Sequence, residues 1–421
     1  MSYLKRKMTT AAEFAEKVLK TDIRYIARGG FWLTVGRGAS MLSSLLLSIA
    51  FANLLPKETY GSYKYILSIA SVMSLFTLPG MNTAVTQAVA RGHEKTLFSA
   101  TKERIKWGAI GSVVGLCVAG YYLVQHNAFL AIATSIVAIF LPFMDPFTTY
   151  NAFLQGKKNF KWSTLAGNIM QICTAVILLI GMWLSKNALV ILVLYFAANA
   201  LMRYFVFRRV SASVDRSTMD DTQALSYGKH LSAMNILGEI AGNLDNFLAF
   251  HFLGPTGVAS YSIATAPADQ AKGFLSFSDP LLFPQFSKHS DEDIRKHIGR
   301  KFFWYGVFGA VVVAGYWIVA PFFFRLVLPQ YADMIFLSLL YSLSLLNAVS
   351  TPAIIYLGAK RKIKEQYIST LCAYLFQIGS MTLLTAYYGL PGLIVARILT
   401  RYFGASLNIF FFLKPFPQKA T

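Results

Sequence analysis

Long apolar segments alternate with short polar ones along most of this chain. Residues 29–92 show the pattern first, because two apolar runs there flank the short polar sequence Pro56-Lys57-Glu58-Thr59. Each run exceeds the roughly 20 residues that a helix needs to cross a bilayer, so we predict a membrane helical hairpin. Just before it, residues 9–28 place apolar side chains on one helical face and charged ones on the other. That pattern predicts an amphipathic helix lying on the cytoplasmic membrane surface.

Apolar segments of similar length continue to the end of the chain and predict about twelve transmembrane helices. They cover residues 29–54, 60–90, 107–124, 129–154, 162–184, 188–207, 227–252, 258–286, 302–324, 332–357, 367–388 and 392–413. A polar stretch at residues 208–226 lies at their midpoint. We therefore predict an all-α polytopic membrane protein with two six-helix lobes. Its parts are an N-terminal segment at 1–28, an N-lobe at 29–207, a cytoplasmic linker at 208–226, a C-lobe at 227–413 and a cytoplasmic tail at 414–421.

A short pattern near the start of the first lobe returns in the second. Residues 55–63 read LPKETYGSY, and residues 253–261, which lie 198 positions later, read LGPTGVASY. Both segments join the first two predicted spans of their lobe, in the same sense. The sequence thus predicts a parallel repeat, in which an axis along the membrane normal relates the two lobes.

Composition and charge support a membrane protein rather than a soluble one. Of the 421 residues, 55% are hydrophobic and only 14% are charged, although the formal net charge is +20. The basic residues fall mainly between apolar segments, with 30 on one predicted side of the membrane and 3 on the other. By the positive-inside rule, both termini are expected in the cytoplasm and the protein in the cytoplasmic membrane. The charge therefore reports topology, and we expect no nucleic-acid partner.

No enzyme motif is present in the sequence. We find no G-x-S-x-G, no Walker A loop and no HExxH, and the three cysteines lack the spacing of a metal site. We therefore expect no catalytic residue, no metal and no cofactor. Without a nucleotide-binding loop, uphill transport would have to use an ion gradient, of H⁺ or Na⁺, or the flux of substrate.

Several ionisable side chains fall inside the predicted spans, where each costs at least about 2.5–3.5 kcal/mol unless it finds a partner or a watery cavity. Lys64 and Arg203 lie near span ends and can snorkel to the interface. Asp269 and Lys272 are three residues apart and can pair locally. The candidates for binding an anionic head group are Arg37, Lys64, Lys272, Arg397 and Arg401. The candidates for ion coupling are Asp145, Glu239, Asp245, Asp269 and Asp279.

Two readings of these charges remain open. They can line a polar cavity, or they can form structural ion pairs buried between helices. Arg397 and Arg401 are four residues apart and face the same way, which favours either an anionic ligand or facing carboxylates.

The opening hairpin also resembles a known family. It is similar to the N-terminal region of bacterial oligosaccharide flippases of the Wzx type. The similar sequences are the initial GGFW, the LL-P-x-x-x-YG-x-Y turn, the SIAS, LPG and NTAV segments and the basic ARG that follows them. These flippases form the polysaccharide-transporter branch of the multidrug/oligosaccharidyl-lipid/polysaccharide (MOP) superfamily. Residues 244–261 resemble the family's seventh and eighth helices.

This resemblance implies a fold and a function. The fold would be two six-helix lobes forming a V around a central cavity. The substrate would be a polyprenyl-pyrophosphate-linked oligosaccharide, moved from the inner to the outer leaflet by alternating access for cell-surface polysaccharide such as O-antigen. Cationic cavities of this family suit Arg37, Arg397 and Arg401 as contacts for pyrophosphate or acidic sugars. The carboxylates of the second lobe depart from that picture. Expected partners are membrane lipids, a polysaccharide polymerase and glycosyltransferases.

Four alternatives remain at this stage. A cation/drug antiporter of the same superfamily would use the carboxylates, whereas lipid II flippases resemble longer chains. A non-transporting membrane subunit of a glycan-assembly complex would be supported if mutation of Arg37 or Arg397 had no phenotype. A membrane-embedded transferase is disfavoured because no catalytic arrangement stands out.

Overall fold

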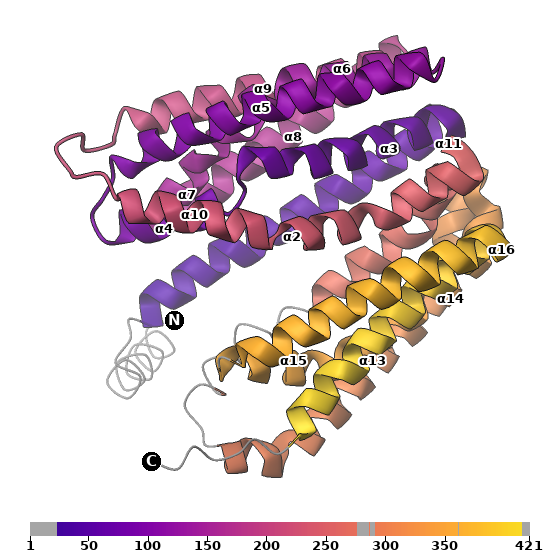
Figure 1. Ribbon diagram of the computed structural model, residues 1–421. Helices are drawn as coiled ribbons and strands as arrows, with labels where there is room; N and C mark the ends of the chain where they lie inside the picture. The colour runs from indigo at the N-terminus through magenta and orange to yellow at the C-terminus, as the bar shows by residue number, and fades with distance from the viewer. Residues whose placement is uncertain (1–22, 276–285, 287–290, 361, 415–421) are drawn as a thin grey trace, which may run out of the picture.

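The protein is a bundle of long helices in two groups that meet at one end and diverge at the other (Figure 1). The structure, a computed structural model, describes residues 23–275, 286, 291–360 and 362–414. The predicted amphipathic helix at 9–28 lies mostly outside the described residues, as do Asp279 and most of the predicted tail.

The first group contains α2 (Ile23–Leu54), α3 (Lys57–Met73), α4 (Met81–Ala90), α5 (Thr96–Val124), α6 (Ala128–Met144), α7 (Thr149–Gly156), α8 (Phe160–Leu184) and α9 (Ala188–Ser211). Two of its spans are broken. The helices Lys57–Thr77 and Met81–Ala90 meet at a bend of 48°, where Leu78 has a positive φ of 54° and Pro79 follows. Pro146 starts a short 3₁₀ turn between α6 and α7. Proline interrupts these spans because it lacks the backbone N–H that a continuous helix needs.

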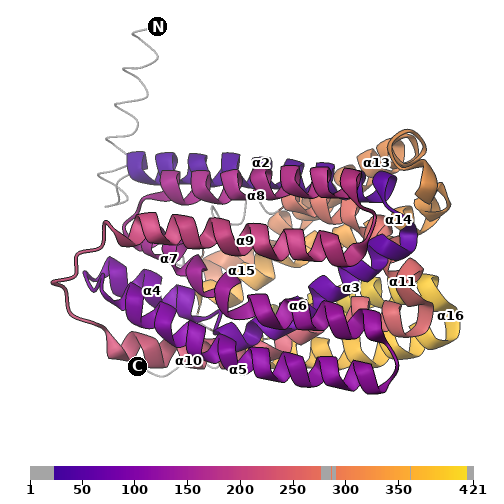
Figure 2. The ribbon, with the colours of Figure 1, turned by 90° about the horizontal axis from the view of Figure 1, so that it is seen from above.

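The short helix α10 (Thr222–Met234) lies against α4 and α5 of the first group (Figure 2). The second group begins with α11 (Ile236–Leu275), followed by α13 (Asp291–Val327). A 3₁₀ turn, Pro329–Met334, leads into α14 (Ile335–Ser342), which continues through the 3₁₀ segment Leu343–Ser350 into α15 (Thr351–Ala359). The last helix is α16 (Ile363–Leu413).

Two of these helices are hairpins rather than straight rods. Gly254 in α11 and Gly389 in α16 have non-helical backbone with positive φ, a conformation that glycine adopts without a steric penalty. Tyr261 donates a hydrogen bond to Asp245, and Phe376 stacks on Phe403 with ring centroids 4.4 Å apart. In a straight helix, with a rise of about 1.5 Å per residue, these pairs would lie far apart. Each helix therefore folds back on itself at its glycine.

Separating the two hairpins accounts for the predicted number of spans. Eight described helices are long and apolar enough to cross a membrane, and nine if the bent pair of α3 and α4 is one span. That count includes α16 once and omits α11. Adding the second arm of α16 and both arms of α11 gives twelve. The predicted all-helical, two-lobed membrane fold is confirmed.

The segment predicted as a linker is docked on the first lobe. Glu94 accepts a hydrogen bond from the backbone N–H of Asp215 at 3.0 Å and also pairs with Lys157. The next helix, α10, packs on α4, where the backbone N–H of Gly80 donates to Ser232 Oγ at 3.0 Å. The chain thus passes from one lobe to the other between α10 and α11. The polar composition of 208–226 does not predict this contact, because polar groups can form hydrogen bonds to protein as well as to water.

The lobes are closed at the end that carries the turns at Pro56, Gly254 and Gly389, which we call the closed end. There the side-chain amide of Asn53 donates to the carbonyl of Val327 at 2.8 Å. One apolar cluster contains side chains of both lobes, among them Phe51 and Tyr60 of the first and Phe324 and Tyr331 of the second. The opposite end, where α2 begins and α16 ends, is the open end.

The two copies of the sequence repeat meet at this closed end. A Cβ atom on Gly61 would lie 1.7 Å from the carbonyl oxygen of Pro255 and 3.2 Å from the backbone nitrogen of Ala259. Positions 61 and 259 correspond under the shift of 198 residues. Equivalent positions touch only close to the axis that relates two copies, so the pseudo-twofold axis passes near this contact.

Gly61→Ala is therefore expected to open the closed end. Its methyl group would collide with backbone rather than with a movable side chain, and overpacking of this kind costs about 1–3 kcal/mol. We expect a cysteine introduced at Leu328, which is 2% exposed, to be alkylated about five- to hundredfold faster, with native cysteines replaced by serine. Gly120→Ala is the matched control, because a Cβ there has nothing within 4 Å. Equal alkylation rates in the two variants would contradict the prediction.

Candidate functional site

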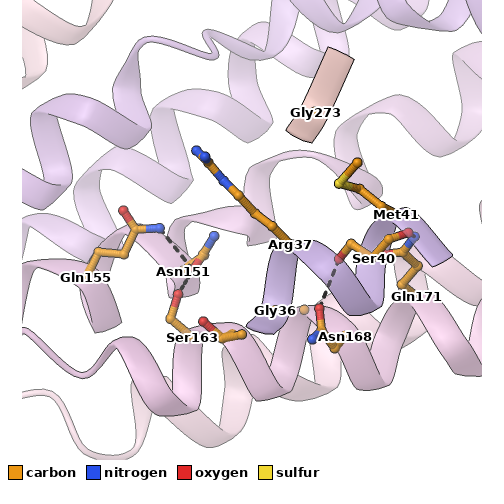
Figure 3. A pocket seen from close by; sticks show the side chains of 12 residues that line it. Gly36, Arg37, Ser40, Met41, Asn151, Gln155, Ser163, Asn168, Gln171 and Gly273 are labelled. Atoms are coloured by element: carbon orange, nitrogen blue, oxygen red, sulfur yellow. Dashed lines mark hydrogen bonds between the residues drawn. The ribbon is translucent and has the colours of Figure 1, made fainter. Parts of the chain in front are cut away.

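An open cavity of about 640 Å³ lies between the lobes on the side of the open end. Its walls come from α2, α7 and α8 of the first lobe, and Gly273 of α11 contributes from the second (Figure 3). It is within the volume range of ordinary ligand sites, about 300–1,000 Å³.

Arg37 projects from α2 into this cavity (Figure 3). Its side chain is exposed, and it forms no hydrogen bond or ion pair with the part of the chain that the structure describes. None of the described residues that line the cavity is a carboxylate. The cavity therefore presents one uncompensated cation, which favours an anionic group as its occupant. Its contact with a substrate stays a prediction.

Neutral polar side chains form the rest of the polar lining. They come from α2, α7 and α8 and comprise Ser40, Asn151, Gln155, Ser163, Thr164, Asn168 and Gln171. They carry no charge, so a search of the apolar spans for ionisable residues alone does not find them. A signal was available, since Thr164, Asn168 and Gln171 are three or four residues apart and share one face of a helix.

In the second lobe, by contrast, Arg397 faces a carboxylate. Its Nη2 lies 3.9 Å from Asp245 Oδ2, and that oxygen accepts a hydrogen bond from Tyr261 at 2.7 Å. These residues come from both arms of α11 and from the second arm of α16. Their mutual contacts lock the hairpin of α11 against α16.

Arg401 is held in the same way one turn further along α16. It donates to Asp269 Oδ1 at 2.8 Å and to Ser344 Oγ at 2.7 Å, and its guanidinium lies 4.8 Å from the centre of the Tyr341 ring. The Tyr341 hydroxyl donates to the same carboxylate. Arg397 and Arg401 thus face carboxylates, one of the two possibilities that their spacing left open. Asp269, predicted to pair locally with Lys272, has this partner on another helix. Lys272 is exposed beside Gly273.

Glu239 lies at the contact between the lobes. Its carboxylate accepts hydrogen bonds from Ser71 of α3 and from Asn243 of its own helix. About two turns further along α11, Asn246 donates to Ser68 Oγ at 2.9 Å. These bonds make a polar seam between α3 and the first arm of α11, and Glu239 also lines a second cavity of about 650 Å³ beside α16. Lys64, on the same helix as Ser68, is half-buried, with its ammonium 5.8 Å from the centre of the Tyr60 ring.

In the first lobe, Asp145 pairs with Arg203 of α9 at 2.8 Å. Arg203 was predicted to snorkel to the interface, and that prediction is wrong because the carboxylate at the α6–α7 break lies within its reach. A sequence signal was overlooked here. Residues 201–205 read LMRYF and residues 399–403 read LTRYF, so Arg203 and Arg401 occupy equivalent positions of the repeat, each paired with a carboxylate of its own lobe.

The most buried cation among the described residues, Arg104, lies between the predicted spans 60–90 and 107–124. Arg104 is only 2% exposed. It donates to the carbonyl of Thr77 at 2.7 Å, to Asn82 Oδ1 at 2.7 Å and to Thr148 Oγ1 at 2.9 Å. These acceptors lie at the breaks of two different spans, so Arg104 joins the α3–α4 break to the α6–α7 break.

Comparison with known proteins agrees with this architecture. A family model described as polysaccharide biosynthesis protein matches residues 26–290. No curated protein sequence matches the chain.

Three solved structures illustrate its likeness in fold. Lipid II flippase MurJ in an inward closed conformation is similar with 13% identity and a TM-score of 0.71, over 91% of this chain and 87% of that one. MATE in complex with MaL6 is similar with 13% identity and a TM-score of 0.61, over 92% and 95% of the two chains. A MOP superfamily transporter from Pyrococcus furiosus Vc1 is similar with 13% identity and a TM-score of 0.59, over 92% of this chain and 94% of that one. At such identities the likeness concerns the fold alone.

Proposed function

Because the chain belongs to the polysaccharide biosynthesis protein family, we propose that it is a lipid-linked oligosaccharide flippase of the MOP superfamily. In this proposal it moves a polyprenyl-pyrophosphate-linked oligosaccharide from the inner to the outer leaflet of the cytoplasmic membrane. The product feeds the synthesis of cell-surface polysaccharide such as O-antigen. The observation that carries the proposal is Arg37, an unpaired cation in a cavity between two lobes.

The geometry suits this substrate in two respects. The pyrophosphate would contact Arg37, whose guanidinium can donate two parallel hydrogen bonds to phosphate oxygens. The polyprenyl tail would stay in lipid beside the lobes while the head group occupies the cavity. With the open end and both termini in the cytoplasm, as the distribution of basic residues predicts, the structure corresponds to the state that loads substrate.

Transport would proceed by rocking of the lobes about their contact at the closed end. Among the coupling candidates, Glu239 fits best, because its hydrogen bonds cross from α11 to α3 and its carboxylate has no arginine partner in the described chain. Protonation or Na⁺ binding there would weaken or remove that cross-lobe bond. Asp145, Asp245 and Asp269 each face an arginine, which favours a structural role.

These ion pairs also argue against a cation/drug antiporter. Such a transporter would need carboxylates available to a cationic substrate, whereas Asp145, Asp245 and Asp269 are paired with arginines and the described lining of the cavity around Arg37 has no carboxylate. Of the described coupling candidates, Glu239 alone lines a cavity without an arginine partner. A scaffold without transport activity would have no reason to keep an unpaired arginine in a cavity. We further propose that a polysaccharide polymerase and glycosyltransferases act beside this protein, since they would consume and supply its substrate.

Reconstituted transport tests the proposal. The purified protein is placed in liposomes that contain a fluorescent polyprenyl-pyrophosphate-linked oligosaccharide, and a membrane-impermeant reductant quenches label on the outer leaflet. We expect label initially protected inside to become reducible only when the protein is present. Liposomes with a fluorescent phospholipid serve as the control for leakage and for scrambling. Equal protection with and without the protein would overturn the proposal.

A further inference from the structure

The wall of neutral side chains beside Arg37 contains four carboxamides on two helices. Asn151 and Gln155 belong to α7, and Asn168 and Gln171 belong to α8 (Figure 3). A carboxamide carries both donors and an acceptor but no charge. Buried amides in membrane proteins commonly join helices, so the question is which of their groups remain available to a ligand.

The amides of α8 are oriented by bonds to α2. Gln171 Nε2 donates to the backbone carbonyl of Ser40 at 2.9 Å and to Ser44 Oγ at 3.0 Å. A carbonyl oxygen can only accept, so this contact requires the NH₂ group and leaves Gln171 Oε1 as an acceptor. Asn168 Oδ1 accepts from Ser40 Oγ at 3.0 Å, which leaves its NH₂ group as a donor. That group lies 3.6 Å from the Cβ position of Gly36, beside the methyl group of Thr164.

The amides of α7 are oriented in a similar way. Asn151 Oδ1 accepts from Ser163 Oγ and, at 3.4 Å, from Gln155 Nε2. Asn151 therefore keeps its NH₂ group as a donor, and Gln155 keeps Oε1 as an acceptor. The two helices thus offer donors at Asn151 and Asn168 and acceptors at Gln155 and Gln171, all lining one cavity (Figure 3).

The presence of both donors and acceptors on this wall indicates the chemistry of the ligand. Sugar hydroxyl groups donate and accept at the same time, and N-acetyl groups carry one donor and one acceptor, so both match such a wall. A divalent cation is disfavoured, because the described lining has an arginine and no carboxylate to balance the charge of the ion. An acyl chain would leave the amides without partners, at a cost in free energy for each one.

Resting on the proposed function, we infer that the amides of α7 and α8 form a saccharide subsite, which binds uncharged sugar units adjacent to the pyrophosphate at Arg37. Arg37 supplies affinity for the phosphate that all such lipids share. The amides supply the preference for a glycan on that phosphate. The inter-lobe cavity therefore binds the anionic part and the neutral part of the head group at two separate places.

Binding of two matched probes to the full-length protein in nanodiscs tests this division. One probe is a short-chain prenyl pyrophosphate that carries a neutral N-acetylated disaccharide, and the other is the same prenyl pyrophosphate without sugar. We expect the wild-type protein to bind the glycan-bearing probe about tenfold or more tightly. Gln155→Leu and Asn168→Leu should each reduce that ratio about two- to tenfold, the usual effect of one lost hydrogen bond. Arg37→Gln should weaken both probes equally and keep the ratio.

The outcomes separate the two levels of the proposal. A ratio that is unchanged in both amide variants, when their thermal unfolding matches that of the wild type, would overturn the saccharide subsite and leave the flippase proposal intact. Failure of the wild type to bind either probe would count against the flippase proposal itself. The free disaccharide, lacking the lipid anchor, should bind far more weakly; equal binding would mean a site for soluble sugar and would also overturn the inference. Gln125→Leu, at an exposed amide at the end of α5, is the control variant.

Discussion

Replacing Arg37 with glutamine is expected to lower transport of the lipid-linked oligosaccharide by about ten- to hundredfold, because charged hydrogen bonds contribute about 1.5–3 kcal/mol. Glutamine keeps a polar, though shorter, side chain but removes the only charge that the described cavity lining provides. The stability of the protein should not change, because Arg37 is exposed and bonds to no described residue. The measurement is the initial rate of flipping in proteoliposomes, alongside thermal unfolding of the same preparation.

Two further variants sharpen this prediction. Arg37→Lys should recover part of the rate, since an ammonium keeps the charge but cannot bind phosphate through two parallel hydrogen bonds. Arg325→Gln is the matched control, because it removes an equally exposed arginine at the closed end of the bundle. If Arg37→Gln and Arg325→Gln transport at the same rate, Arg37 has no part in substrate binding.

Replacing Arg104 with alanine is expected to have the largest effect on folding. Arg104 donates charged hydrogen bonds to three neutral acceptors, and one such bond contributes about 1.5–3 kcal/mol, while its loss leaves a buried acceptor unsatisfied. One of them, the Thr77 carbonyl, lies where the helix is broken, and the backbone N–H of Met81 donates to Leu78 there instead. In a membrane no water is available to replace the lost donor. We expect the variant to accumulate poorly and to unfold at a clearly lower temperature in detergent.

The neighbouring residue Lys102 provides the control for Arg104. It lies on the same helix, α5, and is exposed, so Lys102→Ala should change the free energy of unfolding by no more than about 0.5 kcal/mol. Arg104→Lys should be intermediate, because a lysine ammonium cannot reach all three acceptors in the planar arrangement of a guanidinium. Unfolding of Arg104→Ala at the wild-type temperature would refute the structural role.

The number of spans and the two-lobed plan could be predicted because they depend on local composition. A run of about 20 apolar residues crosses a bilayer wherever it occurs, and the short turns at Pro56, Gly254 and Gly389 interrupt such runs visibly. Even the hairpins of α11 and α16 were separated correctly by the sequence. The repeat of residues 55–63 at 253–261 likewise anticipated two lobes related by an axis, and its two copies touch at Gly61 and Ala259.

The partners of the interior charges could not be predicted in this way. Hydropathy indicates that a residue lies in a span, but it does not show the direction in which its side chain points or which helix lies opposite. Arg397 and Arg37 looked alike in the sequence, yet one faces Asp245 and the other faces a cavity. Arg104, read as part of a basic connection, belongs to the core because the broken spans leave acceptors that only a long cation can reach.

The sequence by itself determined that this protein is a membrane bundle of two related halves, because the cost of exposing polar backbone to lipid leaves few alternatives for long apolar segments. Only the tertiary structure decided that Arg37 faces a cavity without a carboxylate in its described lining, that neutral amides accompany it, and which end of the bundle is closed. These features depend on the rotation and approach of helices that are distant in the sequence. Local composition does not predict such contacts, because they form only when the helices pack.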